Sequence, residues 1–430
     1  MPKFKSIPFT IFCFVLSFFG FLWVQEQPTI NVFAPTEMEA SKQGSQITIQ
    51  LLDQEEEQQN SQAVDEWIKE FHLLYPQYHV ARRTYPPGEL QQKFTTAASA
   101  GQASDMVWAQ NDLAGVFHKA NLILPLNDWV DQTLFTHQIF ETVTLDNKVY
   151  GIPISYGNHL MLLYNKKYVP KAPKDTDTLL RNVSDFQKKH KSKKQKDPHG
   201  LVFNLGDSFW LAPIIHGYGG TLLEEQKITL NTPAMTGALQ FLYDLKFKYR
   251  ATPGECDYEC AKALFLEGSA PFIINGDWFL KEASKVLKDD LGVAPLPIIS
   301  QTHIPMKPFL SGKFIFVNND LKREKIPAIK KWLEFLTSDK IQKDLALRMG
   351  RLPALLTAQN SQEVLSIPHM KDVLAATKAG VPLPPFIHMH AIWGAMAPIQ
   401  QKVLTGELKP SLAGPLMQRG AMDKLSSFER

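Results

Sequence analysis

The sequence predicts an α/β protein built as two lobes, with the chain crossing between the lobes more than once. Three observations lead to this prediction. The chain has 430 residues, enough for two or three domains of ordinary size. Its first part alternates strand-like and helix-like segments, which is typical of a mainly parallel sheet covered by helices. A helix-rich part follows, and strand signals then return late in the chain.

The opening segments have the βαβαβ order that a doubly wound sheet requires. Short apolar strands alternate with helices, and the expected bounds are 47–52, 78–82 and 105–109 for the strands and 61–74 and 89–100 for the helices. The first of these helices carries its large apolar residues, among them Trp67 and Phe71, on one face. Such a stripe predicts a helix that packs against the sheet.

Later helices carry clear start and stop signals. Thr232 and Pro233 are typical of an N-cap followed by proline at the first helical position. Ser338 predicts the N-cap of another helix, and Gly350 predicts its end. A further helix is expected at 327–336, and strands are expected again at 270–275 and 314–317.

The amino-terminal residues are typical of an export signal. Lys3 and Lys5 precede an uncharged apolar run at 7–24, which as a helix would nearly span a bilayer. No small-x-small cleavage site is evident after this run, so a cleaved signal and an uncleaved anchor both stay open. Residues 1–28 are therefore assigned to a signal peptide or membrane anchor, and the polar residues 29–44 to a linker.

Composition excludes several classes of function. The chain carries 46 basic and 43 acidic residues, a net charge of +3, which argues against a nucleic-acid partner because such proteins need a basic face.

The cysteines and histidines exclude other kinds of site. Three cysteines are too few for a disulfide framework or a four-cysteine zinc site. Cys256 and Cys260 are four apart, which favours a local disulfide at a helix start over a redox-active pair. His388 and His390 have no carboxylate or cysteine nearby in the sequence, so neither a metal site nor a cofactor is predicted.

Common catalytic motifs are missing from the sequence. It contains no Walker-type phosphate loop, no H-E-x-x-H, no G-x-S-x-G elbow and no G-x-G-x-x-G after a strand. Missing motifs do not by themselves exclude an enzyme, because glycosidases use two carboxylates with no fixed spacing. The sequence favours a protein that is not an enzyme and has no catalytic residues.

Aromatic and short polar residues stand together near several expected strand ends and helix starts. An aromatic face can stack on the apolar face of a sugar ring, while carboxylates and amides take hydrogen bonds from its hydroxyls. The sequence therefore predicts a carbohydrate site. Its candidate residues are Asp112, Tyr156, Asn158, Asp207, Phe209, Trp210, Asp277, Trp278 and Trp393.

The tryptophans divide into two groups. Trp278 and Trp393 each follow a loop-like segment and are expected to open a helix beside the site. Phe209 and Trp210 are adjacent, so only one of them is expected to face a ligand. The other tryptophans considered are expected in the core, namely Trp67, Trp108, Trp129 and Trp332.

From about Ile47 to the C-terminus the sequence resembles the extracellular solute-binding proteins of carbohydrate importers, the group typified by maltose-binding protein. The segments that carry the resemblance occur in order, and they include SDMVWAQNDLAG, LVFNLGDSFWLAPIIHGYGG, FIINGDWFL and HAIWGAM. The resemblance implies the periplasmic binding protein fold, in which two discontinuous lobes close over a ligand by hinge motion. It places lobe one at 45–156 and 312–357 and lobe two at 157–311 and 358–430.

The resemblance also assigns roles to the candidate residues. It implies a ligand aspartate at Asp112, an acidic–aromatic segment at Asp207 to Trp210, and stacking tryptophans at Trp278 and Trp393. The segment from Tyr156 to His159 corresponds to the crossover between lobes.

Some positions depart from maltose-binding protein. Ala109 and Leu113 stand where it has a tryptophan and an arginine, and Ala397 replaces a further arginine. Asp277 and Arg351 are candidates for the polar contacts that these changes remove. The sequence therefore leaves the identity of the sugar open.

The function expected from the resemblance is sugar capture for an ABC importer. Its partners would be a sugar ligand, a permease in the inner membrane and a separate ATPase, and the protein would be an exported monomer. Three alternatives stay open. They are a binding protein for a non-sugar solute, a sensor that signals to a membrane receptor, and an exported glycoside-acting enzyme that uses two of the aspartates.

Overall fold

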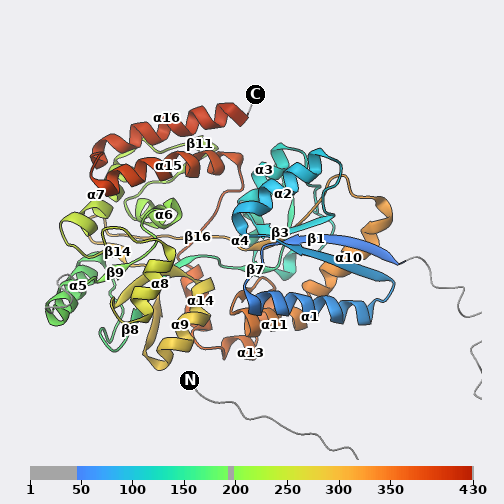
Figure 1. Ribbon diagram of the computed structural model, residues 1–430, viewed down its shortest axis with the longest axis horizontal. Coiled ribbons are helices and arrows are strands. Elements are labelled where there is room, and N and C mark those ends of the chain that lie inside the picture. Colours follow the sequence, from blue (N-terminus) through green and yellow to red (C-terminus); the bar gives the residue numbers. More distant parts are fainter. Residues whose placement is uncertain (1–45, 192–197, 429–430) are drawn as a thin grey trace, which may run out of the picture. The chain divides into compact units, whose positions relative to one another are not determined.

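The computed structural model describes residues 46–191 and 198–428, which form a mixed structure of helices and strands (Figure 1). The predicted leader and linker, residues 1–44, lie outside the described residues. Within the described ranges, no helix is both long and apolar enough to cross a bilayer.

The first sheet has five strands in the order β2-β1-β3-β17-β6. Their bounds are β1 (Ile47–Asp53), β2 (Tyr78–Thr84), β3 (Met106–Gln110), β6 (Gly151–Pro153) and β17 (Lys313–Val317). Strand β1 is parallel to both β2 and β3, which confirms the predicted βαβαβ opening. The late strand β17 lies antiparallel between β3 and β6, with Ile315 opposite Trp108. The last strand signal in the sequence therefore completes the first sheet.

Helices beside the first sheet bury the large aromatic residues that the sequence predicts for the core. These helices are α1 (Gln58–Leu74), α2 (Pro87–Ser99), α3 (Leu113–Lys119), α10 (Ile326–Leu336) and α11 (Asp339–Met349). The rings of Phe71 in α1 and Trp332 in α10 meet edge-to-face with centroids 5.0 Å apart. Trp67, Trp108 and Trp332 are fully buried, as predicted, whereas Trp129 is half-buried.

The predicted helix signals act as expected. The Thr232 hydroxyl accepts a hydrogen bond from the Met235 amide at 3.2 Å, at the start of α7 (Pro233–Phe247). Ser338 caps α11 through the amide of Ile341, and Gly350 ends that helix in the left-handed region with φ of +69°. Capping side chains satisfy backbone amides that the first turn of a helix leaves without partners.

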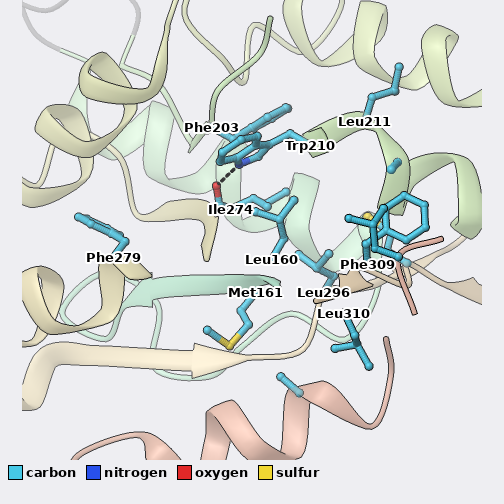
Figure 2. Close-up of a cluster of buried hydrophobic side chains, with 14 of the residues drawn as sticks. Leu160, Met161, Phe203, Trp210, Leu211, Ile274, Phe279, Leu296, Phe309 and Leu310 are labelled. Carbon is cyan, nitrogen blue, oxygen red and sulfur yellow. Dashed lines mark hydrogen bonds between the residues drawn. The ribbon is translucent and has the colours of Figure 1, made fainter. Parts of the chain in front are cut away.

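The second sheet has four strands in the order β13-β8-β12-β9. Their bounds are β8 (Leu160–Asn165), β9 (Leu201–Val202), β12 (Phe272–Gly276) and β13 (Leu291–Ala294). The helices that follow or precede these strands are α5 (Thr176–His190), α6 (Ser208–Gly217), α7, α8 (Tyr258–Leu266) and α9 (Leu280–Leu287). Figure 2 shows the core beside this sheet, where Leu160, Met161, Phe203 and Ile274 gather with Trp210 of α6.

The carboxyl-terminal helices α15 (Ile387–Thr405) and α16 (Pro410–Phe428) run side by side and pack on α7 (Figure 1). The other helices are shorter, with α4 at His137–Glu141, α12 at Leu356–Gln359, α13 at Gln362–Leu365 and α14 at Met370–Thr377. Single 3₁₀ turns occur at η2 (Gln132–Leu134), η3 (Asp277–Phe279), η4 (Lys288–Asp290) and η5 (Arg323–Lys325).

Short strand pairs join the segments that run between the two sheets. Strand β7 (Ser155–Tyr156) pairs with β18 (Leu352–Pro353), and β16 (Phe309–Leu310) pairs with β19 (Val381–Pro382). Gly157 and Ser311 exchange two backbone hydrogen bonds of 2.9 Å. Three further pairs lie elsewhere, formed by β4 (Thr144–Leu145) with β5 (Lys148–Val149), β10 (Leu223–Glu224) with β11 (Lys227–Ile228), and β14 (Ile298–Ile299) with β15 (Ile304–Pro305). The residue bounds of the two lobes stay a prediction.

Candidate ligand-binding site

A cavity of about 650 Å³ is lined by loops that follow strands of both sheets. From the first sheet come the residues after β1, the residues after β3, and Lys313 at the start of the antiparallel β17. From the second sheet come the residues after β12 and the first residues of α6 and α8. Loops at the carboxyl ends of strands are where α/β proteins form their ligand sites. The topology therefore brings distant parts of the chain to one cavity.

Five aromatic side chains form one side of this cavity, and we call them the aromatic wall: Phe209, Trp210, Tyr258, Trp278 and Trp393. The Phe209 ring lies 6.5 Å from that of Trp278 and 6.4 Å from that of Trp393. Phe209, Trp278 and Trp393 are only partly buried, so their faces remain accessible from the cavity.

Local backbone features hold the aromatic wall in place. Asp207 caps α6 by accepting a hydrogen bond from the Phe209 amide at 2.9 Å, which fixes the first turn of that helix. Trp278 folds back over Gly276, and a Cβ at residue 276 would lie 2.1 Å from the indole ring. Glycine is therefore required before Asp277, because any side chain there would displace Trp278.

Trp210 forms the buried base of the wall. Its indole Nε1 donates to the Ile274 carbonyl at 2.8 Å, as Figure 2 shows, and the residue is 7 % exposed. Its ring meets that of Trp278 edge-to-face, with centroids 6.2 Å apart. Both Phe209 and Trp210 line the cavity. That only one of them faces a ligand stays a prediction.

Three aspartates, which we call the acidic trio, line the same cavity as the aromatic wall: Asp112, Asp207 and Asp277. Burial raises the pKa of each of them. For Asp277 burial raises the pKa to about 6, although its Oδ2 accepts a hydrogen bond from the Asn158 amide at 3.0 Å. A carboxylate oxygen can accept more than one hydrogen bond, so these groups can also accept from the hydroxyls of a ligand.

An ion-pair network, which we call the ionic floor, lines the cavity on the side of the first sheet: Gln54, Glu55, Lys313 and Arg351. Arg351 binds Glu55 through both terminal nitrogens, at 2.6 and 2.8 Å, and Glu55 is 2 % exposed. The Lys313 ammonium donates to Gln54 Oε1 at 2.9 Å.

The pKa values within the ionic floor follow from these contacts. Burial alone would raise the pKa of Glu55, but the charges of Arg351 and Lys313 and the two hydrogen bonds from Arg351 lower it to about 2. Burial lowers the pKa of Lys313 to about 8, and the Glu55 charge opposes that change. The pKa of Glu55 and that of Lys313 therefore each depend on the opposite charges beside them.

The crossover segment contributes one residue to the cavity. Gly157 has φ of +110° and Asn158 has φ of +42°, both in the left-handed region that favours glycine and asparagine. Asn158 lines the cavity, but Tyr156 does not. The Tyr156 ring is buried, and its hydroxyl donates to Gln138 at 3.3 Å. Tyr156 therefore supports the crossover and does not face the cavity.

The structure brings nine of the ten predicted ligand residues to this single cavity: Asp112, Asn158, Asp207, Phe209, Trp210, Asp277, Trp278, Arg351 and Trp393. Their contact with a sugar stays a prediction. Trp278 lies in η3 just before α9, near a helix start as expected. Trp393 lies in the second turn of α15, so it does not open that helix.

Sequence reasoning missed Tyr258 and most of the ionic floor. Tyr258 had a local signal, since it is an aromatic residue at a capped helix start between two cysteines. Glu55 and Lys313 had none, because their partners lie far away in the sequence.

The arrangement can recognise a polar ligand that has an apolar face. Aromatic rings are available for stacking, and carboxylates and charged groups around the same cavity are available for hydrogen bonds. Among the residues that the structure describes, no three histidine, cysteine, aspartate or glutamate side chains are grouped to hold a metal ion.

Several proteins of known function resemble this chain in sequence. The sequence profile of a family described as bacterial extracellular solute-binding protein matches residues 66–372. The maltotriose-binding protein of Pyrococcus abyssi is 26 % identical over 338 residues, covering 76 % of this chain and 71 % of the relative. The maltodextrin-binding protein MdxE of Bacillus subtilis is 25 % identical over 303 residues, covering 68 % of this chain and 71 % of the relative.

Among solved structures, the maltose/maltodextrin-binding domain MalE from Bdellovibrio bacteriovorus, bound to maltotriose, superimposes with a TM-score of 0.79 at 31 % identity. The match covers 88 % of this chain and all of that domain. The two-lobed periplasmic binding protein fold expected from the sequence is therefore present. With the profile match over most of its length and a shared fold, this chain belongs to the family of bacterial extracellular solute-binding proteins.

Proposed function

We propose that this protein is the carbohydrate-binding component of an ABC importer. It captures a sugar, from a monosaccharide to an oligosaccharide or a polyol glycoside, in the cavity that the aromatic wall and the acidic trio line. It then delivers the sugar to a membrane permease that works with a separate ATPase. The observation that carries the proposal is the meeting of five aromatic side chains and three aspartates around one cavity.

The aromatic wall supplies shape selection. Phe209, Trp278 and Trp393 are partly buried yet open to the cavity, so their ring faces can stack on the apolar faces of sugar rings. Asp112, Asp207 and Asp277 accept hydrogen bonds from hydroxyls, and a ligand lacking those hydroxyls leaves buried carboxylates unpaired. The names of the relatives put maltotriose and maltodextrins first among the sugars to test.

The protein acts as an exported monomer outside the cytoplasmic membrane, held there by the apolar run at 7–24 if that run is not cleaved. It performs no chemistry on its ligand. Sugar binding favours the closed arrangement of the lobes, and the permease distinguishes that arrangement from the empty one. A sugar incubated with the protein should be recovered unchanged.

A thermal-unfolding panel tests the proposed function. Maltose, maltotriose, longer maltodextrins, other di- and trisaccharides and polyol glycosides are each added to the purified protein. A sugar present at about 100 times its Kd should add about 2.7 kcal/mol to the free energy of unfolding, an easily measured shift. No shift with any sugar would overturn the proposal.

Trp278→Ala should weaken binding of the best sugar by about 30-fold, since a central tryptophan commonly contributes about 2 kcal/mol or more to binding. Titration calorimetry measures this change. The matched control is Tyr249→Ala, which removes a 36 % exposed aromatic ring that does not line the cavity. Its affinity should equal that of the unaltered protein, and an equal loss in both variants would place the sugar elsewhere.

A further inference from the structure

A disulfide lies directly beneath one member of the aromatic wall. Cys256 and Cys260 are bonded, with their Cα atoms 5.3 Å apart. Cys256 is in the loop before α8 and is 8 % exposed, and Cys260 is in the first turn of that helix. The bond therefore encloses Asp257, Tyr258 and Glu259, the residues that begin the helix.

Tyr258 points from this closed turn into the cavity wall. Its ring meets that of Trp210 with centroids 6.3 Å apart, and its side chain hydrogen-bonds that of Trp278. The Lys262 ammonium lies 5.3 Å from the ring centroid on the next turn of α8. Burial raises the pKa of the Tyr258 hydroxyl. Tyr258 therefore contacts two other rings of the aromatic wall, Trp210 at its base and Trp278 at its surface.

The same turn is tied to the segment that leads into α6. The Cys256 carbonyl accepts a hydrogen bond from the Leu205 amide at 3.3 Å, and Leu205 stands two residues before Asp207. Asp257 caps α8 through the Cys260 amide at 2.9 Å. The disulfide thus connects a residue fixed to the α6 side of the cavity with the first turn of the helix that carries Tyr258.

A disulfide across so short a loop constrains the unfolded chain little, because its effect on unfolded-state entropy grows with loop length. Its main effect is therefore expected in the folded protein, at the turn that it closes. We propose that the Cys256–Cys260 disulfide positions Tyr258 against Trp210 and Trp278 and thereby sets the affinity for sugar. This inference rests on the proposed function, and Cys256 and Cys260 are positioning residues that act through Tyr258.

The test compares sugar affinity with and without the bond. Cys13→Ser is introduced first, so that Cys256 and Cys260 are the only cysteines in the full chain. Maltotriose is titrated into this protein before and after treatment with dithiothreitol, a dithiol that transfers two electrons and two protons to the disulfide and is itself oxidised to a cyclic disulfide. The variant with Cys256→Ser and Cys260→Ser is titrated in parallel.

Loss of the bond should raise the Kd by about 5- to 10-fold, the range expected when aromatic contacts of about 1 kcal/mol are disturbed. Tyr258→Ala should weaken binding by a similar factor. In the Tyr258→Ala background, loss of the bond should change the Kd by less than about twofold, because the two changes act on one contact. Equal Kd values with and without the bond, or an undiminished effect in Tyr258→Ala, would overturn the proposal.

Hydrogen exchange separates this inference from the proposed function. Reduction should speed amide exchange in peptides covering 256–262 and 207–210 and leave exchange in α10 unchanged. This result does not depend on which ligand binds. If no sugar binds, the proposed function fails while the exchange result still decides whether the bond orders this part of the wall. Unchanged exchange at 256–262 would overturn the positioning role even if sugar binds well.

Discussion

Replacing Arg351 with methionine should lower the free energy of unfolding by about 3–5 kcal/mol, the usual cost of removing one partner from a buried ion pair. Glu55 is 2 % exposed and takes both of its strong hydrogen bonds from Arg351, at 2.6 and 2.8 Å. The variant leaves Glu55 buried with Lys313 as the nearest charge, 4.0 Å away. Urea unfolding at pH 7 without sugar measures the loss.

Two further variants give this prediction its controls. Arg348→Met removes another arginine of the same part of the chain, but its partners Glu66 and Asp344 both remain in contact with solvent, so the loss should stay below about 1 kcal/mol. Combining Arg351→Met with Glu55→Gln removes both charges and should recover a large part of the stability. A loss for Arg351→Met no greater than that for Arg348→Met would show that the pair contributes little.

The same ion pair should make the protein sensitive to acid. The pKa of Glu55 falls from 4.5 to about 2 on folding, so its contribution is fully present above about pH 4.5 and is lost as pH falls toward 2. A shift of this size corresponds to about 3 kcal/mol. In Arg351→Met this acid-dependent loss should be much smaller, because the charge and hydrogen bonds that lower the pKa are gone.

Asp277→Asn should raise the free energy of unfolding by up to about 3 kcal/mol at pH 8. Burial raises the pKa of Asp277 from 3.8 to about 6 on folding. Below about pH 4 the carboxyl is protonated in both states and costs nothing. Between pH 4 and 6 the unfolded chain loses its proton first, so stability falls as pH rises, and the full cost is present above pH 6. Asparagine has no charge to bury, and its oxygen can still accept from the Asn158 amide.

Unfolding of Asp277→Asn and of the unaltered protein is compared at pH 4 and pH 8. The gain should appear at pH 8 and vanish at pH 4. Asp131→Asn is the matched control, because that aspartate is held by Thr133 and its pKa is lowered, so its replacement should bring no gain at pH 8. A gain for Asp277→Asn that is equal at both pH values would exclude charge burial as its cause. If Asp277→Asn also binds sugar less tightly, the buried carboxylate lowers the stability of the folded protein but is needed for binding.

Local signals in the sequence are enough to predict most of the fold. The opening strands, the Thr232 and Ser338 caps and the Gly350 stop depend on residues within a few positions of one another, so a short window of sequence contains the whole cause. Trp278 and Trp393, which we propose stack on the sugar, could be identified for a similar reason, since each stands in a short segment that resembles the family. That these two residues lie at one cavity could be expected from the rule that ligand sites form at the carboxyl ends of strands.

The ionic floor could not be predicted in this way. Lysine is seldom buried, so Lys313 at the start of an apolar strand gives no sign that it faces Gln54 inside the protein. Arg351 was a candidate for ligand contact, yet both of its terminal nitrogens bind Glu55. Tyr156 was expected at the ligand and instead lies in the core, because the pairing of β7 with β18 turns it inward. Each of these outcomes depends on a partner distant in sequence.

The position of β17 between β3 and β6 bears on how the protein acquires its fold. Until Lys313–Val317 has been synthesised, both β3 and β6 have an unpaired edge, and the whole second sheet intervenes in the chain between β3 and β17. Strand pairings over such a separation are slow to form, because the entropy of closing the long loop is lost before any stabilising contact is made. We therefore expect the first sheet to assemble only after about three quarters of the polypeptide, as far as Val317, has been made. Such a delay would keep the nascent chain extended while the predicted export signal acts.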